Sequence, residues 1–107
     1  MSEDLYGREP TTPIGVTLSA SGVVIPAVPG RKIRIFAALV NPLAAVQVTF
    51  QSGGTNISGT FSLAANGGFV LPLTNKAWMV TGVGQALTVV MSVSTTLGMQ
   101  LLYDTSP

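Results

Sequence analysis

The sequence contains no cysteine and no histidine in its 107 residues. Without cysteine there can be no disulfide and no thiolate nucleophile, and without either residue no zinc site of thiolate or imidazole ligands can form. A histidine general base is excluded as well. The redox compartment stays open, because a chain without cysteine folds equally well in oxidising and reducing surroundings.

Charged side chains are also scarce. Asp, Glu, Lys and Arg together make up 8% of the chain, against about 25% in an average soluble domain. Four of them lie in the first ten residues, three form the cluster Arg31, Lys32 and Arg34, and after that cluster only Lys76 and Asp104 carry charge. A monomer of this size needs more charge on its exposed faces, so we expect other subunits to cover much of the surface. A monomer coated with Ser and Thr is the alternative.

The few carboxylates are poorly placed for catalysis. Glu3, Asp4, Glu9 and Asp104 all lie near a terminus, where a side chain is difficult to hold in a catalytic geometry. Lys76 lies in a polar turn, where a solvated role is favoured. We therefore expect a protein that is not an enzyme, with no catalytic residue, no bound metal, no cofactor and no small-molecule substrate.

No apolar stretch reaches the roughly 20 residues that a helix needs to cross a bilayer. The first 13 residues are acidic and polar, which is the reverse of a signal peptide. We expect no membrane partner, and synthesis and folding in a cytoplasm.

Turn signals punctuate the chain after Ile14, and short runs rich in β-branched and aromatic residues lie between them. The glycine-rich stretches at 51–55 and 65–68 lack the Gly-Lys-Ser/Thr of a phosphate-binding loop, so we interpret them as hairpin turns. We predict a single all-β domain over residues 14–107, preceded by an extended N-terminal arm over residues 1–13. The predicted fold is a jelly-roll-like β-sandwich of eight to nine short antiparallel strands, whose order the sequence does not give. The expected strands are Val16–Ala20, Val23–Pro26, Lys32–Val40, Ala45–Gln51, Ile57–Leu63, Phe69–Leu73, Trp78–Val80, Leu87–Val93 and Met99–Tyr103.

Alternation within these strands predicts which side chains point outward. Phe36 shares a face with Arg34, and Val90 lies on the face opposite Val89, so both are candidates for contact with another subunit. Tyr6 is an aromatic residue in an otherwise polar arm, which suggests docking into a neighbour's pocket. For Trp78 we favour a role in the core, with a subunit interface as the alternative.

The cluster Arg31, Lys32 and Arg34 enters a strand directly after a Pro-Gly turn. Nucleic-acid binding needs a broader basic surface with interleaved aromatic residues, so we expect no nucleic-acid partner. Contact with acidic groups of a partner protein is our hypothesis, and a solvated strand entry is the alternative.

Three runs of the sequence, at 30–35, 46–53 and 57–68, together with Trp78 and the segment 81–87, resemble a set of small β proteins encoded by tailed bacteriophages and prophages. The resemblance covers about residues 23–103. It implies a virion structural protein without catalytic residues, most simply a capsid decoration (cement) protein that binds the major capsid protein on the outer surface and stabilises the head. Such proteins are commonly trimers, so the resemblance implies a homotrimer on the virion, made in the host cytoplasm. A tail-fibre or adaptor module and a carbohydrate-binding β-sandwich remain the alternatives.

Overall fold

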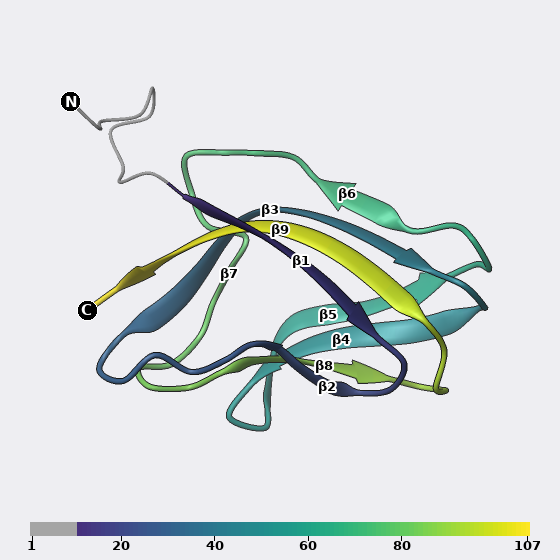
Figure 1. Ribbon diagram of the computed structural model, residues 1–107, viewed down its shortest axis with the longest axis horizontal. Helices are drawn as coiled ribbons and strands as arrows, with labels where there is room; N and C mark the ends of the chain where they lie inside the picture. Colours follow the sequence, from purple (N-terminus) through teal and green to yellow (C-terminus); the bar gives the residue numbers. More distant parts are fainter. Residues whose placement is uncertain (1–10) are drawn as a thin grey trace.

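The computed structural model describes residues 11–107 and is built from β-strands and their connections (Figure 1). The nine strands are β1 (Thr12–Leu18), β2 (Gly22–Ile25), β3 (Lys32–Pro42), β4 (Val46–Ser52), β5 (Thr55–Leu63), β6 (Phe69–Leu71), β7 (Met79–Val80), β8 (Leu87–Met91) and β9 (Leu97–Ser106). The predicted all-β domain is confirmed. Within residues 11–107, no helix is long and apolar enough to cross a membrane.

The strands form two antiparallel sheets. One has the order β1-β9-β3-β6, with β7 also paired to β3, and the other has the order β2-β8-β4-β5. The pairs are nested within one another: β1 with β9, β2 with β8, β3 with β6 and β7, and β4 with β5. A long hairpin rolled into two layers produces this nesting, which is the strand order of a jelly roll. The jelly-roll β-sandwich predicted from the sequence is therefore confirmed.

Alternate side chains of both sheets fill the space between the layers. Phe50 of β4 is fully buried at the centre of this core. Truncating such a side chain to Ala costs about 3–5 kcal/mol, since a cavity remains where the ring was. The other core residues with the lowest exposure are Ile25, Ile33, Ile35, Val40, Val48, Leu87, Val89, Leu97 and Leu101.

A β-bulge in β3 changes which of its residues face the core. The pairing with β9 shifts between Ile35 and Ala37, so that Phe36 is an extra residue on this strand. Unbroken alternation from Ile35 would bury Leu39. Instead Ala38 is buried and Leu39 is 50% exposed. The bulge thus places an apolar side chain on the outer surface.

The strand on the other side of β3 is divided into two short pieces. Leu71 of β6 pairs with Ala38, Met79 of β7 pairs with Ile35, and residues 72–78 leave the sheet between them. The indole Nε1 of Trp78 donates a hydrogen bond of 2.8 Å to the carbonyl of Pro72, which closes the excursion.

Both glycine-rich stretches form turns, but only the first is the predicted hairpin turn, between the paired strands β4 and β5. The prediction for 65–68 is wrong, because this turn joins β5 to β6 in the other sheet. Asn66 and several glycines adopt a positive φ, a conformation that side chains with a Cβ disfavour. These residues are Gly30, Gly53, Gly54, Asn66, Gly68 and Gly84.

Strand β1 begins earlier than the sequence suggested. Thr12 and Pro13, the last two residues of the predicted arm, pair with Tyr103 and Leu102 of β9. Tyr6, the predicted docking residue of the arm, lies outside the described residues.

Candidate partner interface

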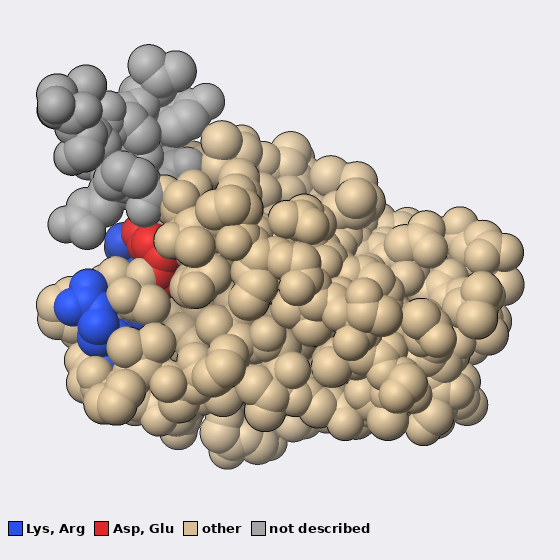
Figure 2. Space-filling view, viewed as in Figure 1, with Lys and Arg blue, Asp and Glu red and all other residues tan. Residues whose placement is uncertain are grey.

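The charged side chains of the domain gather at one end of the molecule (Figure 2). Arg31, Lys32 and Arg34 lie where β3 begins, and Asp104 lies near the end of β9, beside them. Most of the remaining surface in this view carries no charge. Most candidate contact surfaces of the described residues are therefore uncharged.

Arg34 is held by its own chain. Its Nε and Nη2 donate hydrogen bonds of 2.7 and 2.6 Å to the two carboxylate oxygens of Asp104. Asp104 is 6% exposed, so the paired charges are largely removed from water on the carboxylate side. Such a bidentate pair is geometrically specific, and here it fixes the register of β3 against β9.

Arg31 is also used within the domain. Its Nε donates to Oγ1 of Thr105 at 2.8 Å and its Nη2 to the Thr105 carbonyl at 2.9 Å. Lys32 is half-buried and pairs through its backbone with Ser106 of β9. Contact of the cluster with partner carboxylates stays a prediction, but two of its three cations first stabilise the fold.

The predicted exposure of Phe36 is wrong. The ring does share the face of Arg34, whose guanidinium carbon lies 5.4 Å from the ring centroid. Yet Phe36 is only 2% exposed and does not belong to the core between the sheets. Alternation thus placed the ring on the correct face of the strand, but it does not show whether that face is covered, and here it is.

Val90 is exposed as predicted, at 40%, on the outer face of the second sheet. This face carries hydrogen-bonded pairs of polar side chains between β4 and β5. Thr49 and Thr60 are joined through their hydroxyls at 2.8 Å, and Gln51 donates to Asn56 at 2.8 Å. Because these groups satisfy one another, the face is polar between β4 and β5, and Val90 lies beside it together with Val23 of β2, which is 49% exposed opposite Thr88.

The first sheet has a different outer face, on which Val80 of β7 is 41% exposed opposite Arg34. Four further apolar side chains of this sheet and of the excursion at 72–78 are exposed as well. Leu39, Val70, Leu73 and Trp78 are between 43% and 63% exposed. Leu39 and Val70 are paired across β3 and β6, and Leu73 and Trp78 belong to the excursion that follows β6. We call these four residues the Trp78 patch. The predicted core position of Trp78 is wrong, because its 44% exposure places it at the surface.

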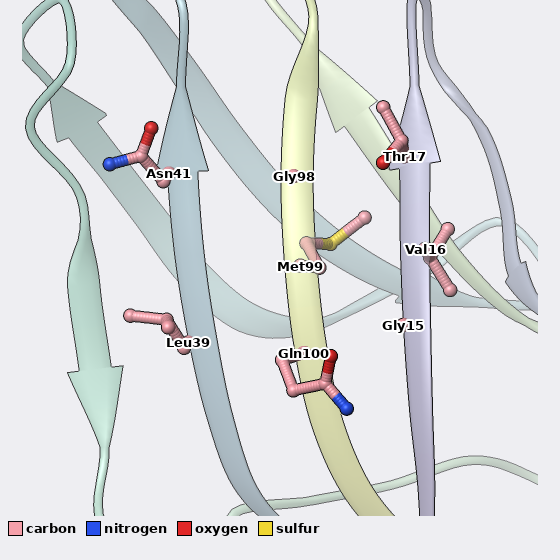
Figure 3. Close-up of a pocket in the computed structure, with 8 residues that line it drawn as sticks. All are labelled: Gly15, Val16, Thr17, Leu39, Asn41, Gly98, Met99 and Gln100. Atoms are coloured by element: carbon pink, nitrogen blue, oxygen red, sulfur yellow. The ribbon is translucent and has the colours of Figure 1, made fainter.

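Shallow hollows lie on the same face of the sheet. One of about 270 Å³ is lined by three members of the Trp78 patch, Leu39, Val70 and Leu73. A second, of about 320 Å³, extends across β9 to β1, where Gly15 and Gly98 form a floor without side chains (Figure 3). Both hollows share Leu39 and Gln100, so together they make one uncharged depression across the sheet.

Sequence reasoning missed most of this surface for two reasons. The bulge at Phe36 reverses the alternation beyond it, and no pattern in the sequence reveals the bulge. Leu73 and Trp78 were assigned to strands, whereas residues 72–78 leave the sheet. The one signal available was the Pro72 that interrupts the apolar run, because proline ends regular pairing.

The described residues offer few groups for chemistry. Asp104 is the one acidic side chain in residues 11–107, and its carboxylate is bound by Arg34. Within this part of the chain there is no group of three His, Cys, Asp or Glu residues that could hold a metal ion.

Comparison of the chain with models of known protein families and with curated proteins finds no match.

Proposed function

We propose that this protein is a non-enzymatic capsid decoration protein of a tailed bacteriophage, which binds the major capsid protein from outside and stabilises the head. The observation that carries the proposal is the Trp78 patch, an exposed apolar surface formed by β3, β6 and the excursion at 72–78. The likeness of the sequence to small phage proteins directs the proposal to a virion. The jelly-roll fold supports it, since viral capsid domains use this architecture.

The composition of the patch is that of an interface centre. Tryptophan is the residue most enriched among energetic hot spots, and interface centres are depleted in charge. Trp78 is also held in place, because its indole N–H bonds the Pro72 carbonyl. A fixed aromatic ring loses little side-chain entropy when a partner covers it.

The protein composition of purified virions tests the proposal. Particles produced by a phage that encodes this chain are purified and their proteins quantified by mass spectrometry. A decoration protein is present in a fixed proportion to the major capsid protein, while a tail-fibre or adaptor protein is present in few copies. Absence from the particle would refute the proposal.

Two variants then locate the surface. Trp78→Ala, added back to heads that lack the protein, is expected to bind at least about 30-fold more weakly, as for a hot-spot residue. Val90→Ala on the polar face is the matched control and should bind as the unaltered protein does. Equal binding by both variants would remove the Trp78 patch from the interface.

A carbohydrate-binding module is the second candidate, favoured by one local arrangement. Trp78 shares a shallow hollow of about 340 Å³ with Thr74, Asn75 and Lys76. An exposed indole beside an amide and a cation can stack on a sugar ring and bond its hydroxyls. Asn75→Ala separates the two functions: it should abolish sugar binding on a glycan array and leave attachment to heads intact.

A further inference from the structure

Three of the four sheet edges carry features that hinder pairing with another strand. In β5, residues 57–59 lie opposite the single residue Phe50, whose N–H bonds Ser58 Oγ instead of a backbone carbonyl. The edge formed by β6 and β7 consists of three and two residues separated by the excursion at 72–78. Strand β2 has four residues with an irregularity at Val24, and Pro26 follows it.

Strand β1 is the exception. Its seven residues pair with β9 in unbroken register from Thr12 to Leu18, with no bulge. Beyond Pro13, which lacks an N–H, nothing in the strand hinders a further strand: it has no charged residue and no second proline. Alternate residues of β1 turn their N–H and C=O groups away from β9, and among the described residues no strand pairs with that side.

We propose that β1 is the pairing edge for a second copy of this chain. The two β1 strands run antiparallel about a two-fold axis and join the β1-β9-β3-β6 sheets of two molecules into one continuous sheet. The result is a homodimer, in contrast to the trimer that the family resemblance implies. This association does not depend on the proposed attachment to capsids.

A second copy fits this edge better than a partner of other chemistry. A two-fold axis sets each strand against itself, which brings like charges together wherever a strand is charged. The segment Thr12–Leu18 avoids that repulsion because it contains no charged residue. For the same reason it offers no charge for a charged partner strand to recognise. The outward-facing Gly15 and Thr17 are small, so they leave the approach to the edge open.

The solution mass tests the proposal. Analytical ultracentrifugation of the full chain at micromolar concentration is expected to give about 22 kDa, twice the chain mass of 11.0 kDa. Thr17→Lys places an exposed charge on the edge, two residues from Gly15 at the middle of the paired segment, and should give the monomer mass. Ser62→Lys is the matched control on the bulged edge β5 and should remain a dimer.

Cross-linking gives an independent measurement, because the natural chain has no cysteine. Thr17→Cys treated with a bismaleimide whose spacer spans about 13 Å, the length of four strand residues, is expected to form a covalent dimer, while Ser62→Cys stays monomeric on a denaturing gel. A wild-type mass of one or three chains overturns the proposal. So does a dimer that survives Thr17→Lys, or cross-linking through Ser62→Cys instead of Thr17→Cys.

Discussion

Arg34 and Asp104 face each other across β3 and β9, and the guanidinium donates one hydrogen bond to each carboxylate oxygen. Asp104 lies near the end of β9, the last strand, yet it is among the most buried polar residues of the described chain. The pair therefore joins the end of the chain to the start of β3. Arg34, which the sequence offered as a candidate for partner contact, therefore forms an ion pair within the domain.

Replacing Arg34 by Met should lower the free energy of unfolding by about 3 kcal/mol, because Asp104 would remain buried without its countercharge. The loss stays at the low end of the range for buried pairs, since the Arg34 side chain is 33% exposed. The double variant Arg34→Met/Asp104→Leu should recover most of this loss. Urea titration of the three proteins measures both effects, and a double variant less stable than Arg34→Met would contradict the argument.

Gly68 cannot be replaced without moving the backbone. Its φ is 128°, and a Cβ at this position would lie 2.0 Å from the carbonyl oxygen of Val40. We expect Gly68→Ala to cost more than about 3 kcal/mol or to prevent folding, as for severe backbone strain and overpacking. Gly59→Ala is the control, because no atom lies within 4 Å of its added Cβ, and it should change the thermal midpoint little.

Ser52 connects two loops that the sequence leaves far apart. Its buried hydroxyl accepts a hydrogen bond of 2.9 Å from the N–H of Gly82 and donates to Oε1 of Gln85. Ser52→Ala should destabilise the domain by about 1–3 kcal/mol, since a part-buried N–H loses its acceptor. Thr55→Ala, exposed in the same hairpin, should remain within about 0.5 kcal/mol of the unaltered protein when unfolding is followed by circular dichroism.

Trp78 should matter more for binding than for folding. Because the ring is 44% exposed, Trp78→Ala is expected to lower the free energy of unfolding by only about 1–2 kcal/mol, below the range for a buried Trp. Phe50→Ala, fully buried, should cost at least twice as much. A loss of stability from Trp78→Ala equal to that from Phe50→Ala would show that the ring supports the core.

The strands could be predicted because their signals are local. Alternation in Val46, Val48 and Phe50, bounded by turn residues, correctly placed β4 and its buried face. The turn at Gly53 and Gly54 was predicted because glycine tolerates positive φ.

The surface could not be predicted, because it depends on pairings between distant residues. Phe36 is an extra residue only relative to β9, and Leu39 becomes exposed only as a consequence. Arg34 finds Asp104 through the same pairing. Residues so far apart in the chain carry no mutual signal in a single sequence, so the sequence offered Trp78 only as an alternative interface residue and did not indicate Leu39, Val70 or Leu73.

The nested pairing also determines when the domain can form during synthesis. Strand β9 lies between β1 and β3, and β8 lies between β2 and β4, so the last two strands to leave the ribosome occupy central places in both sheets. Until residues 87–106 are available, each sheet is open in its middle. Contacts of such long sequence separation are associated with folding on the millisecond-to-second scale, slower than in helical domains of equal size. Neither layer can therefore close in a nascent chain before residues 87–106 have emerged, and truncation before Leu97 leaves both β1 and β3 without their common neighbour.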